Sequence, residues 1–132
     1  MVKVIGGGAV EEGRGGRKLL RLKITAEVGR VEGEYTIVDR VLREYTITYS
    51  RRGRNNAAEG YAVARADAPD GREADAERFS ALVKALTGKG PRIRRKSDGT
   101  IELVCGRGHL DGFARFAELA DAIERWLKET GR

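Results

Sequence analysis

The only histidine of the chain, His109, follows the only cysteine, Cys105, by four residues. A cysteine near a histidine suggests either a nucleophile with its general base or a pair of metal ligands. A metal site needs three or four such ligands, and the sequence has no CxxC, HxH or HExxH spacing to supply them. Cys105 also completes an apolar alternation with Ile101 and Leu103, which is typical of a buried strand residue. We therefore predict no catalytic residue and no metal ligand, and we place His109 as a polar residue where the last helix begins.

Two glycine-containing segments resemble phosphate-binding loops without completing either pattern. Near the N-terminus, Gly6 and Gly8 match the first two glycines of the GxGxxG motif of dinucleotide-binding folds, but Glu11 occupies the third position. The EEGRGGR segment that follows is too rich in glycine for the helix that this motif requires. The Gly-Lys-Gly run at 88–90 lacks the upstream glycine and the following Ser or Thr of a P-loop, so it indicates the end of a helix. No cofactor is expected.

The carboxylates mostly stand next to basic residues, as in Asp39-Arg40 and Glu124-Arg125. Such pairing is typical of a solvated, ion-paired surface. A metal-dependent nuclease would need several acids that converge in space, and no spacing in the sequence indicates such a cluster. A small nuclease that uses scattered acids and a divalent metal is one alternative hypothesis.

Arginines and tyrosines provide the remaining chemistry. Arginines crowd a polar loop at 51–56 beside tyrosine-containing strands, and a second basic run covers 92–96. An Arg side chain holds a phosphate with two donors, and a base stacked on an aromatic ring gains ~1–3 kcal/mol whatever the sequence. We predict that phosphates are bound by Arg21, Lys23, Arg51, Arg52, Arg54, Arg92, Arg94, Arg95 and Lys96. We predict that bases stack on Tyr45, Tyr49 and Tyr61.

This hypothesis requires the cations to converge on one sheet face or on its rim. Tyr45, Ile47 and Tyr49 share one face of a strand, and that face is equally suited to the core. The competing interpretation is that the charges are scattered over solvated faces and the tyrosines are ordinary strand residues.

Hydrophobic periodicity predicts the elements that would position these side chains. Residues 1–18 are rich in glycine and basic residues, and we predict a flexible tail there. Strands are predicted at 19–28, 34–40, 45–49 and 57–66, a helix at 73–87, a hairpin at 92–105 and a long helix at 110–130. Connections of the hairpin type favour an α+β fold, with an antiparallel sheet of hairpins packed on a central helix and a long C-terminal helix. Residues 19–132 would form this single domain.

The C-terminal helix carries an apolar stripe that includes Phe113, Phe116, Trp126 and Leu127. A stripe wider than the sheet can cover would favour a homo-oligomer. A protein-interaction or oligomerisation module that uses this helix is therefore the second alternative hypothesis. Otherwise the stripe caps the domain's own core.

Composition narrows the class of partner. The 132 residues fit one domain, and 26 Lys+Arg against 20 Asp+Glu give a net charge of +6, which favours polyanions. No stretch approaches the ~20 apolar residues of a membrane helix and no signal segment is visible, so no membrane partner is expected. The single cysteine cannot form an internal disulfide, which predicts a reducing, cytoplasmic location. The 35% of charged residues and the absence of Gln indicate a thermophilic source, with GC-rich codon bias as the alternative.

The basic hairpin region, the central helix and the C-terminal FARFAELADAIERWLKE segment together resemble the archaeal ThermoDBP-related proteins. The resemblance extends from about Leu19 to the C-terminus and rests on element order, thermophilic composition and the last helix. Members of that family are single-stranded DNA-binding proteins of hyperthermophiles, in which an antiparallel sheet girds a helix beside a basic, partly apolar cleft. The resemblance implies binding of single-stranded DNA, or also RNA, with little sequence preference, and it assigns no individual residue.

Overall fold

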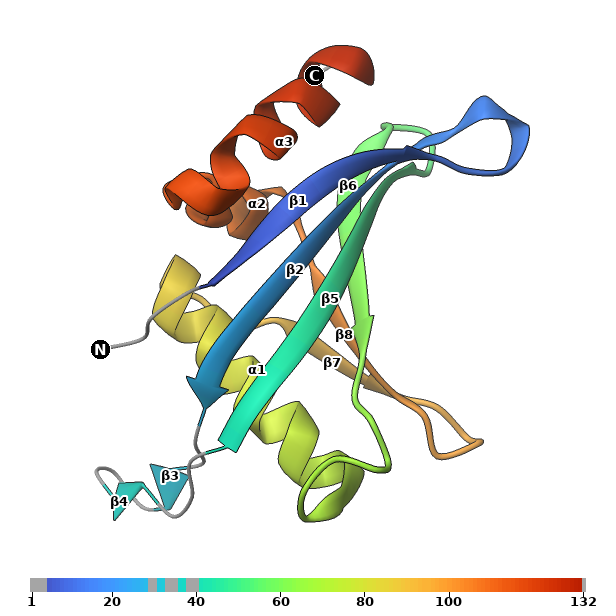
Figure 1. Cartoon of the computed structure of the whole chain (residues 1–132). Coiled ribbons are helices and arrows are strands. Elements are labelled where there is room, and N and C mark those ends of the chain that lie inside the picture. The colour runs from blue at the N-terminus through green and yellow to red at the C-terminus, as the bar shows by residue number, and fades with distance from the viewer. Residues whose placement is uncertain (1–4, 29–30, 33–35, 38–40, 132) are drawn as a thin grey trace.

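The computed structural model describes residues 5–28, 31–32, 36–37 and 41–131. They form an α+β fold, in which a six-stranded antiparallel sheet carries the helices on one face (Figure 1). The strands are β1 (Ile5–Glu12), β2 (Lys18–Val28), β3 (Val31–Glu32), β4 (Thr36–Ile37), β5 (Val41–Arg52), β6 (Ala57–Val63), β7 (Arg92–Arg95) and β8 (Ile101–Cys105). The helices are α1 (Gly71–Thr87), α2 (Arg107–Phe113) and α3 (Ala117–Glu129), with a 3₁₀ turn at Arg14–Gly16. The sheet order is β1-β2-β5-β6-β8-β7, β3 pairs with β4 in a separate two-stranded sheet, and the predicted fold class is confirmed.

Alternation along the central strands builds the core between the sheet and the helices. In β2, Leu20, Leu22 and Ile24 are fully buried, and the residues between them point to the opposite face. In β5, Ile47 is paired with Leu22 and is buried in the same layer. The apolar stripe of α1 packs on this layer with Ala76, Phe79, Leu82, Val83 and Leu86. None of the described helices lies on the other face of the sheet (Figure 1).

The first strand corrects the predicted flexible tail. Residues 5–12 form β1, which pairs along its whole length with β2, from Ile5 opposite Thr25 to Glu12 opposite Lys18. Gly8 allows α3 to pack closely, because a Cβ atom at this position would lie 2.7 Å from the Cβ of Ala122. The glycine that argued for flexibility in the sequence is therefore a close-packing position between a strand and a helix.

The C-terminal segment is two helices rather than the single helix predicted at 110–130. The chain leaves the helical conformation at Phe116, which has φ −95° and ψ 124° between α2 and α3. The break lets Phe113 of α2 and Leu119, Ile123 and Trp126 of α3 all reach the core, where they are buried. The apolar stripe thus caps the chain's own core. None of the described helices is long and apolar enough to cross a membrane.

Both predicted hairpins are present. β5 and β6 are joined by a turn at 53–56, and β7 and β8 by a turn in which the N–H of Lys96 donates to the carbonyl of Thr100. The strand predicted at 45–49 is longer, because β5 begins at Val41. The strand predicted at 34–40 falls outside the described residues except for Thr36–Ile37.

A buried carboxylate joins α1 to the sheet. Asp75 accepts hydrogen bonds from Arg43 Nε at 3.0 Å, from the Tyr45 hydroxyl at 3.0 Å and from the backbone N–H of Arg65 at 2.8 Å. Burial by itself would raise the pKa of Asp75, but the hydrogen bonds from these three donors outweigh it and hold that pKa below its ordinary value. Asp75 is therefore ionised at neutral pH, and its hydrogen bonds with Arg43 and Tyr45 link α1 to β5.

Candidate nucleic-acid interface

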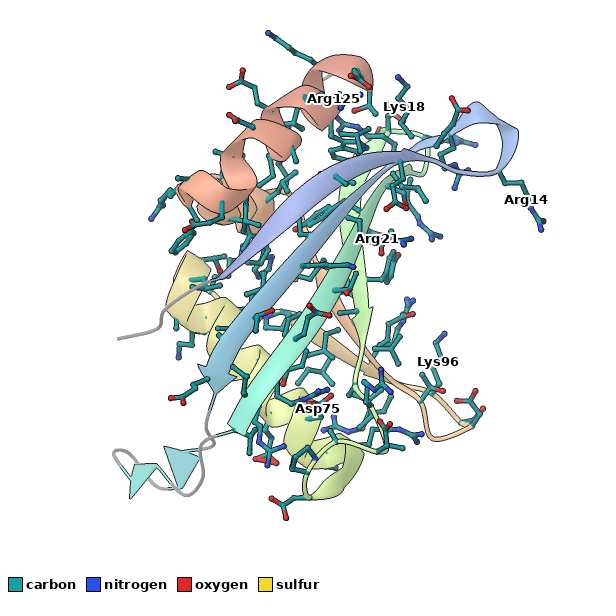
Figure 2. All side chains as sticks on the ribbon, viewed as in Figure 1. Arg14, Lys18, Arg21, Asp75, Lys96 and Arg125 are labelled. Atoms are coloured by element: carbon teal, nitrogen blue, oxygen red, sulfur yellow. The ribbon has the colours of Figure 1, made fainter. Side chains whose placement is uncertain are left out.

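The face of the sheet opposite the helices, here called the open face, carries a mixture of cations, hydroxyls and the ring of Tyr61. It receives the side chains that alternate with the buried ones, so Arg21 and Lys23 of β2 emerge there between Leu20, Leu22 and Ile24. Figure 2 shows Arg21 and Lys96 on this side, away from the helices. The open face also holds Thr48 and Arg52 of β5, Tyr61 of β6, Glu102 of β8 and Arg94 of β7.

A groove of about 490 Å³ lies on the open face, between the β1–β2 hairpin and the β7–β8 hairpin. Arg17, which directly precedes β2, borders the groove on one side, and Arg94 and Lys96 of the β7–β8 hairpin border it on the other. We call this the basic groove, and its lining consists of Arg17, Leu19, Thr48, Ser50, Arg52, Tyr61, Arg94, Lys96 and Glu102.

The Tyr61 ring lies close to two guanidinium groups in the basic groove. Arg52 Cζ lies 4.8 Å from the ring centroid, and Arg94 Cζ lies 6.0 Å from it. The Tyr61 hydroxyl donates a hydrogen bond to Glu59, and this bond raises the pKa of Tyr61, so the phenol stays neutral. A half-buried flat ring beside cations is the arrangement on which a nucleobase can stack while its phosphates are held nearby.

Comparisons with protein-family models, with curated proteins and with solved structures gave no match. What the groove can bind therefore has to be inferred from its own chemistry.

Carboxylates neutralise part of the positive charge on the open face. Glu102 lies 2.6 Å from Arg94 and 3.6 Å from Lys96, measured from its carboxylate oxygens to their nitrogens. At the edge of the sheet, Arg92 lies 3.7 Å from Glu59. Within residues 5–28, 31–32, 36–37 and 41–131, by contrast, no ion pair involves Arg17 or Arg52 of the basic groove, or Lys23 of β2.

Two of the three predicted stacking residues are buried in the core. Tyr45 is 4% exposed and stacks on Phe79 at a centroid distance of 4.5 Å. Tyr49 is fully buried, and its hydroxyl donates to the carbonyl of Gly106 at 2.9 Å. Burial raises the pKa of both phenols. The prediction that these two rings stack on bases is wrong, because the strand face that they share is the core face.

Five of the predicted phosphate-binding arginines lie outside the basic groove, namely Arg21 and Arg92 of the open face and Arg51, Arg54 and Arg95. Arg51 packs over the Trp126 ring at 4.8 Å and donates to Thr130 on the helix side of the sheet. Arg95 also faces the helices, where it forms a 2.8 Å ion pair with Glu73 of α1. Arg54 is exposed in the β5–β6 turn and is not part of the groove lining. Alternation within each strand explains why Arg51 and Arg95 are separated from their neighbours Arg52 and Arg94.

The sequence did not predict five residues of the lining, namely Arg17, Leu19, Thr48, Ser50 and Glu102. Arg17 was assigned to a tail that is in fact part of a hairpin. Thr48 and Ser50 flank the buried Tyr49. Because side chains alternate along a strand, both would have been predicted on the open face if Tyr49 had been assigned to the core. Glu102 alternates with Ile101 and Leu103 in the same way.

Cys105 packs in the core, and His109 lies in the first turn of α2. Cys105 is fully buried, which raises its pKa to about 12. His109 Nδ1 accepts the N–H of Gly106 at 3.1 Å, and Nε2 lies 2.9 Å from the carbonyl of Gly90. His109 is therefore a buried residue of α2 rather than a polar loop residue. Among the described residues, no three His, Cys, Asp or Glu side chains come together in a way that would hold a metal ion.

Proposed function

We propose that this protein binds single-stranded nucleic acid, with little dependence on sequence, in the basic groove. The observation that carries the proposal is the placement of Tyr61, a half-buried ring next to Arg52 and Arg94 in a groove bordered by cations from two hairpins. The resemblance to the ThermoDBP-related proteins points to the same class of ligand and stays a prediction.

Each part of the groove has a role in this proposal. One base stacks on Tyr61 or on the Arg52 guanidinium beside it, which contributes ~1–3 kcal/mol per base and does not discriminate between bases. Arg52, Arg94 and Lys96 hold the phosphates, and Arg17 lies at the border of the groove. The hydroxyls of Thr48 and Ser50 on the groove floor offer hydrogen bonds to a base edge or to a sugar.

A single strand suits this groove better than a duplex does. Bases in a duplex are stacked on one another, so an aromatic ring on a sheet gains access to a base face only when the strand is unpaired. The three predicted cations of the groove, Arg52, Arg94 and Lys96, would then bind the phosphates of the backbone, and the Tyr61 ring would stack on a base.

Fluorescence anisotropy with labelled oligo-dT over a series of salt concentrations tests the proposal. Each phosphate contact to a single strand contributes about −0.7 to the slope of log K against log salt, so three contacts predict a slope of about −2. A duplex of the same length is expected to bind more weakly than oligo-dT. Absence of binding at low salt, or an affinity that does not change with salt, would refute the proposal.

A further inference from the structure

A second pocket, of about 270 Å³, lies on the open face at the other edge of the sheet. It is lined by Gly7, Gly8, Ala9 and Glu11 of β1 and by Arg21 and Lys23 of β2. Its floor is made of small residues, and two cations from one strand stand beside that floor. We call it the β1–β2 pocket.

Strand register connects this pocket to the basic groove. Ala9 is paired with Arg21, Arg21 with Thr48, and Thr48 with Tyr61, so the four residues lie in one row across β1, β2, β5 and β6. Adjacent strands are ~4.8 Å apart, which places Arg21 about 10 Å from Tyr61 along this row. The row continues from Tyr61 through Val104 to Arg92 at the far edge.

The cations of the β1–β2 pocket have donors available for a ligand. The Arg21 side chain is 39% exposed and forms an ion pair with Glu11 at 3.3 Å, and its buried Nε has no hydrogen-bond partner among the described residues. Lys23 is exposed and forms no ion pair within the described part of the chain. A phosphate oxygen in the pocket can pair with the exposed part of the Arg21 guanidinium and with the Lys23 ammonium.

We propose that the β1–β2 pocket is a second phosphate subsite for the same strand that stacks on Tyr61, so the nucleic acid crosses the sheet at right angles to its strands. This inference rests on the proposed function and adds the direction and length of the bound strand. The path from β7 to β1 spans five strand spacings, about 24 Å. At ~3.4 Å per nucleotide for a stacked strand, and more for an extended one, the site takes on the order of four to seven nucleotides.

A length series of oligo-dT tests the inference on the unmodified protein. Affinity is expected to rise steeply from two nucleotides to about six and then to level off. No binding at any length would refute the proposed function itself. An affinity that already levels off at two or three nucleotides would leave the proposed function intact and overturn the second subsite.

Gly7→Val blocks the β1–β2 pocket without disturbing the core. Gly7 is paired with Lys23, and a Cβ atom built on it meets nothing within 4 Å. Valine favours strands, so the variant is expected to fold at least as well as the parent protein. We expect several-fold weaker binding of an eight-nucleotide oligo-dT and unchanged binding of a three-nucleotide one. Equal effects on both lengths, or no effect on either, would contradict the subsite.

The double variant Arg21→Ala, Lys23→Ala provides the charge test. Loss of two phosphate contacts predicts a salt slope that is less steep by about 1.4 for the eight-nucleotide ligand. Lys18→Ala is the matched control, since Lys18 is in the same strand but forms an ion pair with Glu129 of α3 at 2.8 Å. A slope that changes by about 0.7 in the control, half the change in the double variant, would show that only total charge matters, and would overturn the inference.

Discussion

Arg94 and Arg95 are consecutive residues of β7, yet their guanidinium groups lie on opposite faces of the sheet. Arg94 approaches the Tyr61 ring and forms an ion pair with Glu102 in the basic groove. Arg95 forms an ion pair with Glu73 of α1. Both side chains are exposed and both have one carboxylate partner, so they form a matched pair for separating the role of position from that of charge.

Replacement of each arginine by serine should therefore have different effects. Arg94→Ser is expected to weaken oligo-dT binding and to reduce the salt slope by about 0.7, because one phosphate contact is lost. Arg95→Ser removes the same charge on the helix side and is expected to leave the slope unchanged. Anisotropy titrations of both variants at several salt concentrations measure the difference, and indistinguishable slopes would count against the groove.

The ring of Tyr61, rather than its hydroxyl, is expected to carry base stacking. Tyr61→Ala should raise the Kd for oligo-dT roughly 5- to 150-fold, which corresponds to ~1–3 kcal/mol of stacking. Tyr61→Phe keeps the ring and loses only the hydrogen bond to Glu59, so its Kd should stay close to that of the parent protein. Titrations at one fixed salt concentration compare the three proteins. A phenylalanine variant as weak as the alanine variant would exclude stacking as the reason.

Glu102 is expected to oppose binding, because it competes with phosphate for Arg94 and Lys96. Glu102→Gln should tighten oligo-dT binding about two- to fivefold at low salt, the range expected for release of exposed ion pairs. Glu73→Gln removes one carboxylate from Arg95 on the helix face and serves as the control. If both variants bind equally tightly, the gain comes from net charge and not from the groove.

Asp75 is expected to stabilise the fold in a pH-dependent way. Its pKa is lowered in the folded state, so its contribution is fully present above the ordinary carboxyl pKa and is lost as the pH falls through the folded value. Asp75→Asn should lower the free energy of unfolding by about 3 kcal/mol at pH 7, because Arg43 loses its buried partner. Urea unfolding of both proteins at neutral and acidic pH checks this. The difference should shrink in acid; a constant difference would show that the charge of Asp75 is not the cause.

Periodicity was enough to predict most of the elements and the sheet position of several cations. The alternation of Leu20, Leu22 and Ile24 with Arg21 and Lys23 fixes which side chains share a face, since strand side chains repeat every two residues. It cannot fix which face of β5 is buried, because Tyr45 and Tyr49 are amphipathic and suit either environment. The buried face of β5 is determined by the helices, because Phe79 of α1 packs against Tyr45 and Trp126 of α3 packs against Tyr49.

The first strand could not be predicted because its stability comes from contacts distant in sequence. Glycine has low strand propensity, so local pattern indicates a tail. In the fold, Gly8 lets Ala122 approach, and Leu22 lies beside it. Pairing of β1 with β2 also places Arg17 at the basic groove and forms the β1–β2 pocket. The wrong prediction of a flexible tail therefore left both out of the predicted site.

Photochemical cross-linking locates the bound base most directly. An oligo-dT that carries one central 5-iododeoxyuridine would be bound at low salt and irradiated, and the cross-linked peptide would be identified by mass spectrometry. The proposed function predicts a cross-link at Tyr61, suppressed by high salt. Cross-links confined to the helix side of the sheet, or spread over the surface and insensitive to salt, would contradict it.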